Sequence, residues 1–173
     1  MSLRDVLDAL TGKRRRPPEL PPLPPVPTGD DLLNALRRIN AQVADPAVPG
    51  MVASRVRRIC NIVGQTIPKL GSLGPGSAQA HSVMATATNY LPEALGGYLR
   101  LPEGWRDRRP VDGPRTALMV LCDQLDLLAA TMDDVFDAVN RLDAAALVAH
   151  GAFLEEKFGR GSTGGVLGGL GTP

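Results

Sequence analysis

Apolar residues recur every three or four positions along most of the chain, which is the spacing of one face of an α-helix. The first such stretch starts near Thr28 or Asp30, either of which can cap a helix, and ends at the break DPAVPG (45–50). The second covers about 51–70 and ends in the loop GSLGPGS (71–77). These two stretches predict two amphipathic helices.

Two longer patterns follow them. The third stretch runs from about 78 to 99, and a polar loop then continues to Asp112, which can cap the next helix. The fourth stretch carries an unbroken heptad seam, typical of a helix packed along its length against others. The seam consists of Leu118, Leu121, Leu125, Leu128, Met132, Val135, Val139 and Leu142. Asp143 indicates a cap or a small break before a last helix to Phe158, so the pattern predicts an all-α bundle of four to five helices.

The segments that flank this bundle have a different composition and divide the chain into four parts. Residues 1–12 predict a short amphipathic helix, and 13–27 combine a basic run with PPELPPLPPVP, a stiff polyproline II spacer. The bundle covers 28–158, and 159–173 form a glycine-rich tail that we expect to be flexible. The residues expected to dock on a partner or a membrane are Leu3, Val6, Leu7 and Leu10 on the apolar helix face, followed by Lys13, Arg14, Arg15 and Arg16.

A proline interrupts the third pattern at Pro92. In a helix interior, proline removes a backbone donor and crowds the preceding turn, at a cost of about 3 kcal/mol. The apolar register nevertheless continues across Pro92, which favours a kink or a tight restart of the helix over a chain reversal. Leu91 is disfavoured in the α region because it precedes proline. We expect Tyr90 and Tyr98 to pack on the heptad seam at this bend, with their hydroxyls reaching a loop carbonyl or water.

The run NYLPEALGGY (89–98) resembles the Tyr-Leu-Pro hallmark of the XpaC-like family, which is also named for 5-bromo-4-chloroindolyl phosphate hydrolysis. Residues 127–158 are similar to the closing pair of helices of that family, so the resemblance covers about 50–158. It implies a compact α-helical protein, often encoded near toxic-anion or tellurite resistance functions, and hence a stress-response role. The chain departs from the family in Gly96 and Gly97, where longer polar residues would be expected, and the resemblance implies no catalytic residue.

Composition narrows the class of protein. Only 3% of the 173 residues are aromatic, which favours helix packing over a β-sandwich, and the net charge of +1 argues against a nucleic-acid binder. Cys60 and Cys122 lie in apolar helical runs, which is typical of buried thiols in a reducing compartment. The start of the chain does not read as a signal peptide, and no apolar run reaches the ~20 residues of a membrane span. These features predict a cytoplasmic protein and leave peripheral membrane contact open through residues 1–16.

Charge is divided between two of the predicted helices. Residues 51–70 carry four basic side chains and no acidic one, whereas 113–143 carry six acidic and two basic ones. We favour the interpretation that these helices are neighbours whose charges set their register. The alternative is an acidic face that docks a basic partner.

The residues offer little catalytic material. Asp133 and Asp137 lie four positions apart and could hold a cation, but a solvated acidic face is the simpler interpretation. His81 and His150 are isolated in sequence, and GRGSTG (159–164) lacks the strand and the helix that a dinucleotide loop needs. We therefore predict no catalytic residue, no metal site and no cofactor.

Together these features predict a non-enzymatic interaction or stress-response module. Its proline spacer tethers a helix that recruits a protein partner or an anionic membrane surface. The alternative is a weak metal-assisted phosphate-ester hydrolase, as the family label implies. No nucleic-acid partner is expected, and the heptad seam leaves open whether the fourth helix completes its own bundle or a homo-oligomer.

Overall fold

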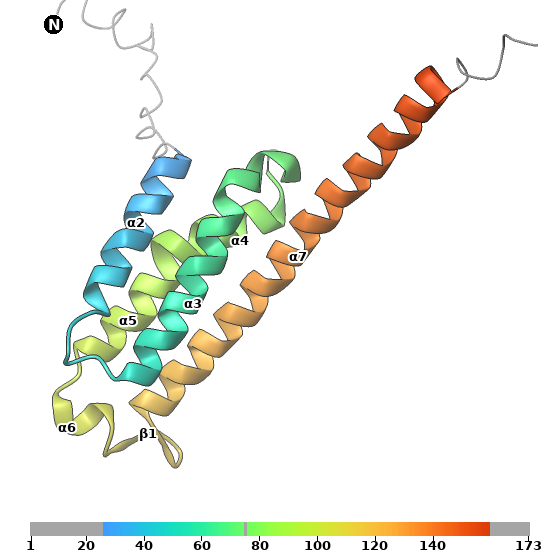
Figure 1. Cartoon of the computed structure of the whole chain (residues 1–173). Helices are drawn as coiled ribbons and strands as arrows, with labels where there is room; N and C mark the ends of the chain where they lie inside the picture. The colour runs from blue at the N-terminus through green and yellow to red at the C-terminus, as the bar shows by residue number, and fades with distance from the viewer. Residues whose placement is uncertain (1–25, 75, 160–173) are drawn as a thin grey trace, which may run out of the picture.

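The computed structural model describes residues 26–74 and 76–159, which form an all-α bundle, as predicted (Figure 1). Its longer elements are α2 (Gly29–Gln42), α3 (Gly50–Thr66), α4 (Ala78–Ala85), α5 (Leu91–Leu99) and α7 (Ala117–Phe158). The helix predicted over 1–12, almost all of the 13–27 spacer and the tail beyond Gly159 lie outside the described residues. Within the two described ranges, no helix has the length and apolar character needed to cross a membrane.

A capping box at Thr28 holds the start of α2. The Thr28 hydroxyl accepts a hydrogen bond from the Asp31 N–H (3.2 Å), and the Asp31 carboxylate accepts one from the Thr28 N–H (2.9 Å). Hydrogen bonds from Thr28 lower the pKa of Asp31, because they favour its charged form. Of the two caps that the sequence allows, Thr28 is the one used.

α3 ends earlier than its periodicity predicts, because Pro68 lacks the backbone N–H that would continue the α-helix. The α-helix stops at Thr66, and a 3₁₀ helix, η1 (Ile67–Leu73), continues in its place. Gly74, with a φ of 78°, then starts the loop to α4. η1 thereby carries Lys69 alongside α7.

α2 and the α4–α5 pair run in one direction, and α3 and α7 run in the other (Figure 1). α3 packs against α2 and α7, and the α4–α5 pair also packs against both, so that the helices enclose one core. Its largest fully buried side chains are Leu32, Ile59, Leu91, Leu95, Leu125 and Met132. Most of the heptad seam of α7 faces this core, so the seam completes the bundle of its own chain.

The charges of α3, η1 and α7 meet as the charge pattern predicts. Three ion pairs join them: Arg55–Asp126 (2.9 Å), Arg58–Asp133 (2.5 Å) and Lys69–Asp143 (3.2 Å). The residue numbers of the aspartates on α7 rise with those of their basic partners on α3 and η1, which shows that α3 and α7 run parallel in a fixed register. This arrangement confirms that the two helices are neighbours with complementary charge.

The chain passes Pro92 without leaving the helical path. A π turn, η2 (Thr86–Tyr90), joins α4 to α5, and the Leu91 N–H bonds to the Thr86 carbonyl five residues back. The wider turn gives the proline ring room against the preceding turn, and Leu91 keeps α-helical angles (φ −70°, ψ −45°) although it precedes proline. The tight restart predicted here is therefore made by one π turn.

The connection from α5 to α7 is more structured than the polar loop predicted up to Asp112. It contains a short helix, α6 (Glu103–Arg106), and two antiparallel strands, β1 (Pro110–Asp112) and β2 (Arg115–Thr116). Gly113, with a φ of 54°, makes the turn between the strands. Asp112 lies in β1, so its prediction as a helix cap is wrong. The Thr116 hydroxyl caps α7 instead, by accepting a hydrogen bond from the Met119 N–H.

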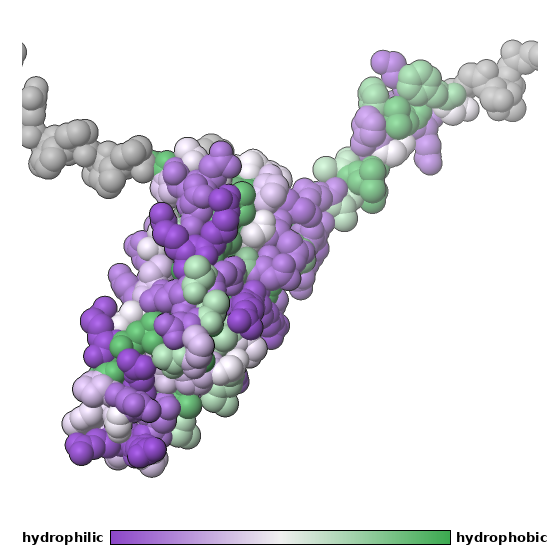
Figure 2. All heavy atoms as spheres, turned by 60° about the vertical axis from the view of Figure 1, so that its left-hand side comes forward, coloured by the Kyte–Doolittle hydropathy of each residue, from purple (hydrophilic) through white to green (hydrophobic). Residues whose placement is uncertain are grey.

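α7 is a single helix of 42 residues, so the break predicted at Asp143 is wrong. Asp143 pairs with Lys69 and does not cap a new helix, and the run AAAL that follows it favours helix strongly. Every residue from 141 to 159 is exposed, and this part of α7 projects beyond the bundle (Figures 1 and 2). The packed bundle therefore ends near Asp143, whereas the helix continues to Phe158.

Leu91→Ala is expected to lower the free energy of unfolding by about 2–5 kcal/mol, because Leu91 is fully buried and its loss leaves a cavity. Pro92→Ala is expected to change it by less than about 1 kcal/mol, because the π turn already accommodates the proline. Urea unfolding followed by circular dichroism measures both values. Equal losses in the two variants would contradict the role given to the π turn.

Candidate functional site

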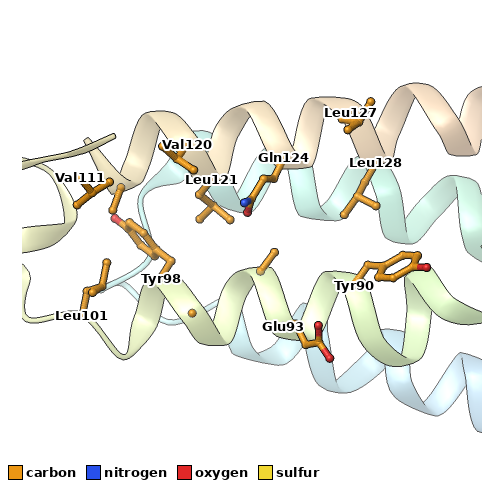
Figure 3. A pocket seen from close by; sticks show the side chains of 13 residues that line it. Tyr90, Glu93, Tyr98, Leu101, Val111, Val120, Leu121, Gln124, Leu127 and Leu128 are labelled. Carbon is orange, nitrogen blue, oxygen red and sulfur yellow. The ribbon is translucent and has the colours of Figure 1, made fainter. Parts of the chain in front are cut away.

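An apolar groove runs between α5 and α7 and has a volume of about 640 Å³ (Figure 3). Its lining comes from α5 with the turns at either end of it, from the start of α7, and from β1. The lining residues are Tyr90, Glu93, Ala94, Gly97, Tyr98, Leu101, Val111, Ala117, Val120, Leu121, Gln124, Leu127 and Leu128. Because apolar side chains predominate among them, the groove suits an apolar ligand.

Two exposed apolar side chains form the rim at one end of the groove. Tyr90 is 49% exposed at the end of the π turn, and Leu127 is 70% exposed on α7. Leu127 lies beside the heptad seam and is therefore not covered by the core. The sequence predicts that Tyr90 packs on this seam, and the structure places it at the end of the π turn, half-exposed and lining the same groove as Leu121 and Leu128 of the seam.

Gly97 leaves the middle of the groove open. A Cβ added there would meet no atom within 4 Å, so this glycine does not serve a close approach of two helices. On the facing helix, Gln124 and Leu128 point into the space between α5 and α7 (Figure 3). Gln124 on α7 points between the two helices, whereas the Glu93 carboxylate lies on the outer side of the α5 wall (Figure 3).

Tyr98 closes the opposite end of the groove and is only 4% exposed. Its hydroxyl donates to the Asp107 carboxylate (2.8 Å), and the Arg106 guanidinium lies over its ring, 5.6 Å from the centroid. Arg106 is held in turn by the backbone carbonyls of Leu99 and Leu101. Burial, followed by the bond to Asp107, raises the pKa of the Tyr98 phenol. Tyr98 packs as predicted, and its hydroxyl reaches the carboxylate of Asp107, where the sequence predicts a loop carbonyl or water.

The acidic pair that could hold a cation is engaged in ion pairs. Asp133 accepts from Arg58 at 2.5 Å, and Asp137 lies 3.9 Å from Arg141, four residues further along α7. Among the residues that the structure describes, no three His, Cys, Asp or Glu side chains come together in a way that could hold a metal ion.

The remaining candidates fall into two groups. His81 and His150 are exposed on α4 and α7, and the structure does not bring them together. Residues 1–16, where the sequence places the docking side chains, lie outside the described residues, as does GRGSTG beyond its first glycine.

The two cysteines are free and buried, as predicted, Cys60 on α3 and Cys122 on α7. Burial raises the pKa of Cys60 to about 11, and it also raises the pKa of Cys122. Both thiols therefore keep their protons at neutral pH. We assign them to core packing.

Comparisons with protein-family models, with curated proteins and with solved structures found no match to this chain. The resemblance to the XpaC-like family accordingly stays a prediction.

The groove depends on residues that the helical periodicity does not single out. Tyr90 reaches the rim at the end of a π turn, and the helical periodicity of the sequence does not predict that turn. One signal was present in the sequence. Val120 and Leu127 stand beside the seam, seven residues apart, and a second apolar stripe next to a complete seam indicates a second apolar surface.

Tyr98→Phe is expected to lower the free energy of unfolding at neutral pH by about 1–2 kcal/mol, because it removes the bond to Asp107. This loss should shrink above about pH 10. The phenol pKa is raised in the folded protein, so wild-type stability falls as the pH rises past the value of about 10 at which the unfolded tyrosine ionises. Urea unfolding from neutral to strongly alkaline pH measures the difference in the free energy of unfolding between the wild type and Tyr98→Phe. A difference that stays constant over this range would contradict the link between Tyr98 ionisation and stability.

Proposed function

We propose that the protein is a non-enzymatic helical interaction module that binds an amphipathic helix of a partner protein in the α5–α7 groove. The groove itself supports this proposal, because it is an apolar channel left open between two packed helices, with Tyr90 and Leu127 exposed at its rim. Exposed apolar surface of this kind is characteristic of interaction sites.

The dimensions of the groove suit about two turns of a helix. Its α5 wall extends from Tyr90 to Tyr98, a distance of about 12 Å along a helix axis. A helix laid along it would present apolar residues at i, i+3 and i+4 to the walls. Glu93 on one wall favours a partner helix with a basic residue beside its apolar face.

A second contact in the proposal involves residues 1–16. Their sequence places the apolar residues from Leu3 to Leu10 ahead of the basic run 13–16, a combination that supports recruitment to a protein partner or to an anionic membrane surface. The proline-rich spacer would let this contact act independently of the groove. The cytoplasmic, membrane-peripheral location and the stress-response role belong to the same proposal, the latter on the family resemblance.

The alternative is a weak metal-assisted phosphate-ester hydrolase, and its support is the family resemblance. It would need Asp133 and Asp137 to bind a cation, whereas Asp133 is held by Arg58. The interaction role therefore has the stronger support.

Gly97→Leu tests the groove directly, because the new side chain enters open space and fills the channel without removing any contact. Gly97→Ala is the matched control. It also replaces a glycine within a helix, which favours the helix by about 1 kcal/mol, but the small side chain leaves the channel open. A photo-crosslinking phenylalanine in place of Tyr90 reports on occupancy in cells. We expect the same crosslinked partner with the wild-type and Gly97→Ala backgrounds and its loss with Gly97→Leu. Equal crosslinking in all three would exclude the groove as the binding site.

Residues 1–16 are tested with vesicles. The full-length protein is expected to co-sediment with phosphatidylglycerol vesicles and not with phosphatidylcholine vesicles. Replacing Lys13, Arg14, Arg15 and Arg16 with glutamate should abolish this binding, since each basic residue near an anionic surface contributes about 1 kcal/mol. The membrane part of the proposal fails if the wild-type protein does not co-sediment. The partner-recruiting part is tested with a photo-crosslinking phenylalanine in place of Leu7, and it fails if this position captures no protein.

A further inference from the structure

The projecting part of α7, residues 141–158, carries apolar side chains that the described bundle does not cover. Leu147 is 73% exposed and Phe158 is 67% exposed. Figure 2 shows these apolar patches on the end of the helix, clear of the rest of the molecule. Because most of the stability of a helix in a protein comes from packing of its apolar face, and this part of α7 has none, a second helix laid along it would stabilise it.

One stripe of this projecting part has a heptad spacing of its own. It consists of Ala144, Leu147, Gly151, Leu154 and Phe158, at intervals of three and four residues. The stripe lies about a third of a turn around α7 from the seam that faces the bundle, so the bundle leaves it free. Small and large residues alternate along its first four positions.

We propose that two copies of the chain associate through residues 141–158 of α7 as an antiparallel pair. When the two-fold axis crosses the helix pair at the level of residue 149, Leu147 of each copy meets Gly151 of the other, and Leu154 of each copy meets Ala144 of the other. Gly151 has room for this contact, because a Cβ added there would meet no atom within 4 Å. Every such layer sets a large side chain against a small one, which lets the two helices pack closely.

The charges beside the stripe favour the same register. Residues on each flank recur every seven positions: Asp143, His150 and Lys157 on one side, and Arg141, Val148 and Glu155 on the other. The antiparallel pair centred at the level of residue 149 sets Arg141 opposite Glu155 of the second copy. It also sets Asp143, which already pairs with Lys69 of its own chain, opposite Lys157 of the second copy. Two-fold symmetry repeats both contacts, which gives four complementary charge pairs from one placement.

A parallel pair would satisfy neither the packing of large side chains against small ones nor the pairing of opposite charges. In a parallel pair, Gly151 would face Gly151 of the second copy, which leaves a gap between the helices. Phe158 would face Phe158 of the second copy, which crowds the end of the pair. Arg141 and Glu155 would then lie about 21 Å apart along the axis. A parallel pair would also bring both bundles to the same end of the shared helices, whereas the antiparallel pair keeps them at opposite ends (Figure 1).

The test uses the full-length protein at tens of micromolar in analytical ultracentrifugation. We expect a mass of about twice 18.3 kDa for the wild type. Arg141→Glu and Glu155→Arg should each raise the dissociation constant about tenfold, because each sets like charges opposite one another twice. The double variant Arg141→Glu/Glu155→Arg should restore wild-type association. Glu156→Arg is the matched control, since Glu156 lies on the opposite side of the helix, and it should leave the mass unchanged.

Gly151→Leu gives an independent test of the packing layers. In a monomer this change falls in open space, so the variant should fold normally, which circular dichroism can verify. In the antiparallel pair the new side chain meets Leu147 of the second copy, so the mass should fall to that of one chain. A monomeric wild type, a double charge variant that does not recover association, or an unaffected Gly151→Leu dimer would each overturn the proposal. None of these outcomes bears on the groove.

Discussion

The parallel packing of α3 against the first half of α7 is the contact on which the rest of the structure depends. Its inner side is a continuous aliphatic core, and its outer side carries the pairs Arg55–Asp126 and Arg58–Asp133. Exposed ion pairs of this kind contribute little to stability, so burial supplies most of the stability and the charges select the register. Fixing that register determines how far α7 extends past the end of α3.

Two surfaces follow from the length of α7. Its start faces α5 and forms one wall of the groove, whereas residues 141–158 continue past η1 into solvent. The two surfaces lie at opposite ends of one rigid helix, about 20 Å apart between residues 128 and 141. A helical ligand in the groove and a second copy along the projecting end would therefore not compete for space, and an antiparallel pair would hold two grooves far from each other.

Much of the bundle could be predicted from the sequence because aliphatic periodicity and charge complementarity act locally on each helix. The heptad seam, the capping role of Thr28 and the pairing of basic α3 with acidic α7 are all visible as residue patterns. Asp143 was misjudged because an aspartate reads as a cap in sequence, whereas its carboxylate serves Lys69 across the bundle. Tyr90 ends a π turn and is half-exposed, and the 3.6-residue periodicity of the sequence does not predict such a turn.

Hydrogen–deuterium exchange along α7, measured at low and at high protein concentration, tests whether the bundle holds the first part of this helix and association holds the rest. We expect amides from about Leu121 to Val139 to be protected at both concentrations. Amides from Ala144 to Phe158 should exchange quickly when the protein is dilute and slowly when it is concentrated. Rapid exchange of the latter segment at every concentration, or equal protection of both parts in dilute solution, would contradict this expectation.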